Sequence, residues 1–135
     1  MELKKNLVNP NELPPPISKY SHGVIIENNN MKLIFVSGQI ALDLKGEIVG
    51  INDVSKQTDY VFKEIKKILE ESGASLRDVV KATIFVTSMN DYQKVADVRN
   101  KYFSESPPAT TFVEVNRLVK DGCLVEIEVI AAISK

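Results

Sequence analysis

Apolar residues recur at helical spacing over one long segment of the chain, residues 53–72. This spacing predicts an amphipathic helix whose apolar stripe packs on the core. Asn52 or Asp53 can cap its start, and Gly73 stands where a left-handed residue often ends a helix. The polar residues between the apolar positions, Glu64 among them, are expected on the solvent side.

Runs rich in β-branched and aromatic residues predict strands on either side of this helix. The first two runs flank an Asn-rich stretch, residues 28–30, and are expected to form a hairpin. Asn90 with Gln93 three residues later resembles a capping box and predicts the start of a second helix. The predicted strands cover residues 24–26, 33–36, 79–87, 110–115 and 124–133, and the second helix extends to about residue 103.

The resulting order, β-β-α-β-α-β-β, predicts an α+β fold. We expect a single domain over residues 1–135, with a mixed sheet and both helices on one face. Residues 33–36 and 84–86 are apolar at consecutive positions, so both faces of their strands should be buried. Because two helices cover only one face, the other is expected to meet further copies of the chain. The pattern therefore predicts an obligate oligomer, with sites at the seams between subunits.

Composition narrows the classes of function. The 135 residues include 17 Lys and Arg against 18 Asp and Glu, a formal net charge of −1, which argues against a protein that binds mainly by neutralising phosphates. A single cysteine, Cys123, and a single histidine, His22, exclude an internal disulfide and argue against a tetrahedral zinc site. The sequence shows neither a signal-peptide pattern nor an apolar segment long enough to span a bilayer, so we expect a cytoplasmic protein.

The last predicted strand carries two carboxylates, Glu126 and Glu128, in alternation with apolar residues. Alternation places both on one face of the strand. The neighbouring positions on that face, Leu124 and Ile130, are apolar, so a carboxyl there should be partly desolvated. Desolvation raises the pKa of a carboxyl and suits it to orienting a water or moving a proton. An isolated Glu-x-Glu is more often an ordinary solvent-facing pair, and that alternative stays open at this point.

Other candidate residues also have an ordinary structural alternative. The Ser-Gly-Gln sequence at residues 37–39 offers close backbone approach and two hydrogen-bonding side chains, or is a plain turn after a strand. Tyr20 can present its hydroxyl to a ligand or cover the edge of the core. His22 is more typical of a surface or packing residue than of a ligand. Nothing near Cys123 in the sequence predicts an activated thiol.

Six segments together carry a resemblance to a known family: YSHG at 20–23, VSGQI at 36–40, GASLRDVVK at 73–81, FVTSMNDY at 85–92, PATTFVEVNRL at 108–118 and EIEVIA at 126–131. They resemble the RidA/YjgF family, also described as endoribonuclease L-PSP proteins. The resemblance implies a chorismate-mutase-like subunit that assembles as a homotrimer with clefts between subunits. It also implies hydrolysis of reactive enamine or imine intermediates, such as 2-iminobutanoate and 2-iminopropanoate, to 2-keto acids and ammonia. Neither a cofactor nor a metal takes part in that reaction.

The resemblance places the family's water-orienting glutamate at Glu126. The arginine that clamps the substrate carboxylate in the family is Thr110 here, and a hydroxyl supplies one neutral hydrogen bond where an arginine supplies a charged, bidentate pair. Lys19 is a candidate for the missing cation, because it precedes the pocket tyrosine. The other pocket positions implied by the resemblance are Tyr20, Ser37, Gly38, Thr111 and Phe112.

The substitution at Thr110 leaves more than one function open. The leading interpretation is an imine or enamine deaminase whose activity depends on how the pocket manages without the arginine. A trimer that binds a small metabolite without turnover is the alternative. A single-stranded RNA endoribonuclease or translation inhibitor, a third function associated with the family, is disfavoured by the acidic balance of charge and by the lack of a basic groove with interleaved aromatics.

Overall fold

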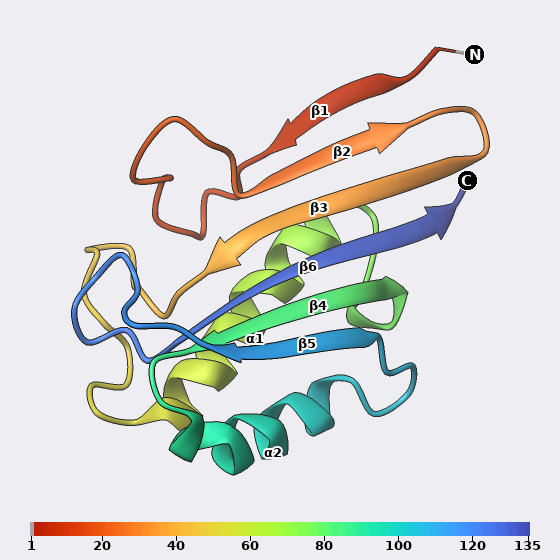
Figure 1. The fold of residues 1–135 in the computed structure, drawn as a ribbon. Helices are drawn as coiled ribbons and strands as arrows, with labels where there is room; N and C mark the ends of the chain where they lie inside the picture. Colours follow the sequence, from red (N-terminus) through yellow and green to blue (C-terminus); the bar gives the residue numbers. More distant parts are fainter. Residues whose placement is uncertain (1) are drawn as a thin grey trace.

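The computed structural model, which describes residues 2–135, contains a mixed sheet of six strands with two α-helices packed on one of its faces (Figure 1). The strands are β1 (Lys4–Val8), β2 (Gly23–Glu27), β3 (Met31–Gln39), β4 (Val79–Val86), β5 (Ala109–Glu114) and β6 (Val125–Ser134), and the helices are α1 (Val54–Glu71) and α2 (Tyr92–Tyr102). The strand order is β1-β2-β3-β6-β4-β5. All neighbours pair antiparallel except β4 and β5, which are parallel and are connected by a crossover through α2.

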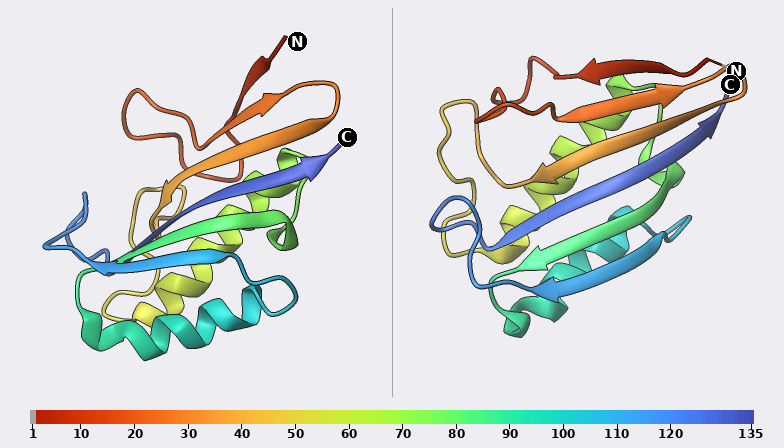
Figure 2. Two further views of the ribbon diagram at one scale, coloured as in Figure 1. Left: turned by 45° about the vertical axis from the view of Figure 1, so that its right-hand side comes forward. Right: turned by 45° about the horizontal axis from the view of Figure 1, so that its top comes forward.

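This architecture confirms the predicted α+β class and the placement of both helices on one face of the sheet (Figure 2). The strand β1 is an addition that the sequence pattern does not predict, because only Val8 of its five residues is buried. It forms by pairing with the free edge of β2, from Lys4 opposite Glu27 to Val8 opposite Gly23. Neither helix in residues 2–135 has the length and apolar character that a membrane crossing requires.

Helix α1 has the ends that the sequence predicts. Asp53 is the N-cap, and its side chain accepts a hydrogen bond from the backbone N–H of Lys56 at 3.0 Å. Gly73 follows the helix with a φ of +86°, the left-handed conformation that glycine adopts without strain. The buried stripe includes Phe62, which stacks on Tyr102 with ring centroids 4.7 Å apart and so attaches α1 to α2.

The start of α2 differs from the predicted capping box. The helix begins at Tyr92, after a short 3-10 turn over Met89–Asp91. The side chain of Ser88 caps that turn by accepting a bond from the N–H of Asn90, whereas Gln93 donates forward to Asp97 at 2.8 Å. The capping-box prediction is therefore wrong, because a serine two residues upstream satisfies the free backbone groups first.

The sheet face opposite the helices carries apolar side chains that a single copy leaves uncovered. In β3, Ile34 and Val36 point to the helices and are buried, whereas Phe35 between them points the other way and is 38% exposed. Within residues 2–135, neither helix covers this face (Figure 2). The strands are thus apolar on both sides, as their sequences predict, and only one side is buried within the chain.

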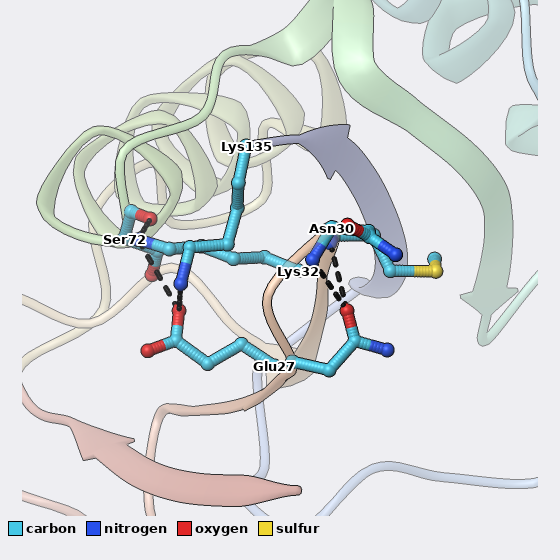
Figure 3. A network of polar contacts seen from close by, with 7 residues as sticks. Glu27, Asn30, Lys32, Ser72 and Lys135 are labelled. Atoms are coloured by element: carbon cyan, nitrogen blue, oxygen red, sulfur yellow. Dashed lines mark hydrogen bonds and ion pairs between the residues drawn. The ribbon is translucent and has the colours of Figure 1, made fainter. Parts of the chain in front are cut away.

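An ion-pair network fastens one end of the sheet (Figure 3). Glu27 at the end of β2 pairs with Lys32 at 3.7 Å and with Lys135 at the C-terminus at 3.6 Å. Lys32 also donates to the backbone oxygen of Ser72, just after α1, at 3.5 Å. The side chain of Asn28 closes the turn between β2 and β3. Its Oδ1 accepts hydrogen bonds from the backbone N–H groups of Asn30 at 2.7 Å and Met31 at 3.0 Å. Side-chain contacts therefore connect β2, β3, the C-terminus and the end of α1 at this end of the sheet.

The three longest connections gather at the opposite end (Figure 1). They are residues 9–22, 40–53 and 115–124. Gln57 of α1, which is fully buried, holds two of them: its Nε2 donates to the backbone oxygens of Gly50 at 3.1 Å and Gly122 at 2.9 Å. Its Oε1 accepts from the N–H of Leu124 at 2.9 Å, one residue before β6 begins. One amide therefore sets where β6 starts relative to α1.

We expect Gln57→Met to loosen this end of the molecule. Methionine preserves the length of the side chain but leaves three backbone groups without partners. Each buried polar group left unpaired lowers the free energy of unfolding by about 1–3 kcal/mol. The free energy of unfolding in denaturant, measured at one fixed protein concentration, should fall by about 2 kcal/mol or more. Gln93→Met, on the exposed side of α2, is the matched control and should change it by about 0.5 kcal/mol or less. Equal stability of the two variants would show that Gln57 does not hold the loops.

Candidate functional site

A pocket of about 440 Å³ opens where the three loops meet the sheet. Its walls come from five parts of the chain: the 9–22 loop, the end of β3 with the loop after it, the middle of α1, the 115–124 loop and the start of β6. The polar side chains among the lining residues are Tyr20, His22, Ser37, Gln39, Glu64 and Glu126.

A β-bulge at the end of β3 shapes one wall. Val36 faces Val129 of β6, but Gln39 faces Ile127, so β3 has one residue more than β6 over this interval. The extra residue lies at Ser37-Gly38. Ser37 is held there from both sides, because its Oγ donates to the backbone oxygen of Ser21 at 2.6 Å and its N–H donates to that of His22 at 2.9 Å. The bulge thereby joins β3 to the 9–22 loop at the pocket.

Gly38 leaves room for the carboxylate of Glu126. A Cβ atom at position 38 would lie 2.8 Å from Cδ of Glu126 and closer still to its Oε2. The glycines with positive φ in the described chain lie elsewhere, so position 38 requires glycine for space and not for its backbone conformation. The Ser-Gly-Gln sequence is thus more than a plain turn: it is the surface against which the Glu126 carboxylate packs.

Burial raises the pKa of Glu126, and the neighbouring charge of Glu128 raises it further. Both side chains lie on one face of β6, where Val125 and Ile127 alternate with them and point into the core. Glu128 is exposed and does not line the pocket, whereas Glu126 is half-buried and does. The alternation argument is confirmed for the shared face and for the direction of the pKa shift.

Glu64 brings a second carboxyl to the pocket, and here the sequence prediction is wrong. Glu64 was expected on the solvent side of α1, but it is 3% exposed and lines the pocket. It lies three residues after Val61 and four before Ile68, both fully buried, so it belongs to the buried stripe. That spacing was available in the sequence, but the run of charged neighbours obscured it.

No group in residues 2–135 forms a hydrogen bond with the Glu64 side chain, and its Oε2 is sealed from solvent. Burial raises the pKa of Glu64 to about 9, and the nearby charge of Lys67 opposes this only in part. The lining of the pocket therefore includes a carboxyl that favours its acid form at neutral pH, Glu64, and a more accessible carboxyl, Glu126.

His22 is a packing residue, as predicted, and it fixes the proline segment against β3. It is buried, with Nε2 lying 2.6 Å from the backbone oxygen of Pro14 and Nδ1 lying 3.2 Å from Nε2 of Gln39. A carbonyl oxygen can only accept and an amide nitrogen can only donate, so Nε2 carries the hydrogen and the ring is neutral. Tyr20 lies at the rim, about half exposed, where its hydroxyl oxygen accepts a long bond from the N–H of Ile17.

The remaining predicted site residues lie away from this pocket in a single copy. They are on β5, which β4 separates from β6, or in the exposed part of the 9–22 loop. Thr110 donates to the backbone oxygen of Pro108 at 3.1 Å and faces a separate hollow beside the end of α2. Thr111 accepts from Lys81 at 2.6 Å, Phe112 packs on Tyr92 with ring centroids 4.7 Å apart, and Lys19 is exposed and does not line the pocket.

The described part of the chain has no group of three or more His, Cys, Asp or Glu side chains placed to hold a metal ion. Cys123 is buried, and burial raises the pKa of its thiol.

A family model described as Endoribonuclease L-PSP matches residues 11–133, almost the whole of the sheet and both helices. The chain belongs to the RidA/YjgF family. A RutC family protein of Pyrococcus abyssi is 45% identical over 96% of this chain and 98% of its own length.

Two further relatives of this RidA/YjgF chain have names that state an activity. One is the 3-aminoacrylate deaminase RutC of Acinetobacter baylyi, 35% identical over 96% of this chain and 98% of its own. The other is a 2-iminobutanoate/2-iminopropanoate deaminase of Dermatophagoides farinae, 32% identical over 96% and 97%. The crystal structure of RidA from Psychrobacter superposes with a TM-score of 0.84 at 32% identity, covering 95% of this chain and 99% of that one.

The contact between Gly38 and Glu126 can be tested by a double-mutant cycle. Gly38→Ala places a methyl group where the carboxylate lies, and overpacking of this kind lowers stability by about 1–3 kcal/mol. Glu126→Ala in the same chain should recover most of that loss, which gives a coupling energy of about 1 kcal/mol or more in denaturant unfolding. The control cycle with Glu128→Ala should be additive to within about 0.5 kcal/mol. Additivity in both cycles would show that the carboxylate does not rest on Gly38.

Proposed function

We propose that this chain hydrolyses a reactive imine or enamine to a keto compound and ammonia, with Glu126 as the residue that orients and deprotonates the water. The observation that carries the proposal is the half-buried carboxylate of Glu126, packed on Gly38 inside the pocket, with a raised pKa. A base whose pKa is shifted toward neutrality takes a proton more readily at physiological pH. The names of two relatives state deaminase activity of this kind.

The reaction needs few groups. Water adds to the carbon of the C=N bond, and Glu126 takes one proton from it as the C–O bond forms. The nitrogen gains protons, the C–N bond of the resulting carbinolamine breaks, and ammonia leaves with a carbonyl in its place. For an imino acid the balance is R–C(=NH)–COO⁻ + H₂O → R–CO–COO⁻ + NH₃. No electron is exchanged with a redox partner, so the protein has to supply only positioning and proton transfer.

We further propose that the functional unit is a homotrimer in which the uncovered sheet faces meet. Phe35 on this face is 38% exposed in one copy, and a large exposed apolar residue on a sheet flanked by half-buried apolar neighbours is typical of an interface. In such an assembly, the β5 edge of a neighbouring copy would bring Thr110, Thr111 and Phe112 to the pocket. Lys19 is exposed and free to approach from the loop side.

We expect a small substrate whose binding depends only weakly on contacts to its carboxylate. In place of the family's arginine the chain has Thr110, whose Oγ1 already donates to Pro108. Loss of a charge-assisted hydrogen bond typically weakens binding by about 1.5–3 kcal/mol, which is roughly a tenfold to hundredfold change in affinity. The proposed enzyme should therefore bind 2-iminobutanoate less tightly than arginine-bearing members do.

Metabolite binding without turnover is the alternative that Thr110 favours, and RNA cleavage is a weaker one. The pocket is lined by two carboxyls and, within the described residues, by no Lys or Arg. A phosphate backbone would meet repulsion from Glu126 there.

The decisive experiment is hydrolysis of 2-iminobutanoate generated in situ by a threonine dehydratase, with semicarbazide trapping the imine that remains. The wild-type chain should accelerate formation of 2-oxobutanoate. Glu126→Gln should lower that acceleration by about 100-fold or more, since general-base catalysis typically contributes 10²–10⁴-fold. Glu128→Gln, two residues along the same face of β6, is the matched control and should retain most of the activity.

Three outcomes separate the functions. Equal rates for Glu126→Gln and wild type would refute Glu126 as the base. If the wild type is inactive and Thr110→Arg restores hydrolysis, the pocket is intact but serves another substrate or binding alone. If both are inactive and 2-oxobutanoate still binds, the non-catalytic alternative is correct.

The trimer can be tested independently of activity. Phe35→Asp puts a charge on the uncovered sheet face, where burial of an uncompensated carboxylate is strongly unfavourable. Light scattering after size exclusion should therefore show a trimer for the wild type and a monomer for this variant. Lys66→Asp, on the exposed side of α1, should remain a trimer. A monomeric wild type would exclude the proposed assembly.

A further inference from the structure

Glu64 is the feature of the pocket that the proposed reaction has not yet used. Of the polar side chains that line the pocket within residues 2–135, Ser37, His22 and Gln39 are engaged as hydrogen-bond donors. The Tyr20 oxygen already accepts the N–H of Ile17 at the rim. The Oε2 atom of Glu64 has no hydrogen-bond partner among the described residues, and Glu126 lines the same pocket.

A carboxyl with this degree of burial and no partner needs a reason. Glu64 is 3% exposed, between the fully buried Val61 and Ile68, where an apolar residue would pack without penalty. Its Oε2 is sealed, and the carboxyl reaches the pocket as one of its lining groups. Leaving a buried polar group unsatisfied is destabilising, and such groups are retained chiefly at functional sites. The carboxyl of Glu64 therefore borders the pocket with hydrogen-bonding capacity that no described residue uses.

We propose that Glu64 is the proton donor of this pocket: in the addition step it protonates the nitrogen of the substrate while Glu126 takes a proton from the water. This inference rests on the deaminase function proposed above and adds a second catalytic residue to it. It also limits the substrate class to compounds whose nitrogen is basic enough to accept a proton from a carboxylic acid, such as an imine or the imine tautomer of an enamine.

The proton transfers balance over two steps. As the C–O bond forms, Glu126 takes a proton from water, and the electron pair of the C=N bond takes the proton of Glu64. The carbinolamine then collapses: its hydroxyl proton returns to Glu64 as the C=O bond forms, and the proton on Glu126 passes to the nitrogen as the C–N bond breaks. Ammonia leaves, and both carboxyls regain their starting state. Two carboxyls whose surroundings favour different protonation states are suited to act as the acid and the base of one reaction.

The electrostatic surroundings of Glu64 favour its acid form. Burial holds the pKa of this carboxyl near 9, so that it carries a proton at neutral pH. Of the groups on its own helix, Lys67 opposes the shift and Tyr60 is close enough for its pKa to respond to Glu64. From the packed elements, His22 and Glu126 line the same pocket, Asp43 on the 40–53 loop is within range of Tyr60, and the buried Cys123 is within range of both glutamates. Lys63, Lys66 and Lys67 line a second hollow along α1 together with Glu64, and of these three cations Lys67 is the one that lowers the pKa of Glu64.

The test compares wild type, Glu64→Gln and Glu70→Gln in the 2-iminobutanoate assay across pH 6–10, with the spontaneous rate subtracted at each pH. Glutamine keeps the size and a hydrogen-bond donor but cannot release a proton. We expect Glu64→Gln to lower kcat by about 100-fold. The wild-type kcat/KM should fall above about pH 9 as Glu64 ionises, and this alkaline limb should be absent from Glu64→Gln. Glu70→Gln, exposed on the same helix, should behave as wild type.

Stability measurements exclude a merely structural effect. Because the folded-state pKa of Glu64 is raised, the folded chain loses stability as pH rises from the ordinary value of 4.5 toward about 9. Glu64→Gln should therefore unfold at the same or a higher temperature than wild type throughout the assay range. A Glu64→Gln variant that folds and keeps both the wild-type rate and the alkaline limb would overturn the inference, even if Glu126→Gln is inactive.

A binding measurement separates this inference from the proposed function. Calorimetric titration with 2-oxobutanoate, whose carbonyl oxygen replaces the imine nitrogen, should show wild-type affinity falling at least about tenfold between pH 7 and pH 10 as the donor becomes a carboxylate. Glu64→Gln should show no such fall. If the wild type binds with this pH dependence but does not catalyse hydrolysis, the deaminase function fails while Glu64 remains the donor to the ligand. The same pH dependence in both chains would exclude Glu64 as a donor.

Discussion

The close approach of the Glu126 carboxylate to the backbone at Gly38 is the constraint on which the pocket depends. It requires an extra residue in β3 opposite β6, because only the bulge turns the strand so that its glycine faces the carboxylate. The bulge in turn is held by Ser37, which bonds to the 9–22 loop. Position 38 has no room for a Cβ atom. This steric limit thus links the register of β3 and β6 to the position of the 9–22 loop, which lines the pocket.

Polar groups inside the protein are used in two different ways at this end of the sheet. The amide of Gln57 is engaged with backbone groups, and the ring of His22 with the backbone oxygen of Pro14 and the side chain of Gln39, so that together they hold three loops in place. Glu64 and Glu126 are not engaged, and burial shifts the pKa of each upward. Satisfied groups make the frame rigid, and unsatisfied ones keep their binding capacity for a ligand.

The sheet has one face covered by helices and one that carries Phe35 toward the outside (Figure 2). In the trimer that we propose, association would both bury this face and complete the pocket with the β5 edge of the next copy. Stability and function would then share a single interface. The substitution of threonine for arginine at position 110 would alter the site from across that interface, without disturbing the frame around Gly38.

The sequence alone determined the order of the predicted elements, the α+β class, the family and the face of β6 on which Glu126 lies. Local periodicity was enough for the face, because it reports how each side chain points relative to its own strand or helix. The tertiary structure decided what those side chains meet. It added β1, whose five residues show little alternation and which exists by pairing with β2, and it placed Ser88 in the cap assigned to Asn90. It also moved Glu64 from the expected solvent side into the pocket. Burial depends on contacts between segments far apart in the chain, and a local pattern such as the spacing of Glu64 relative to Val61 and Ile68 reports it only in part.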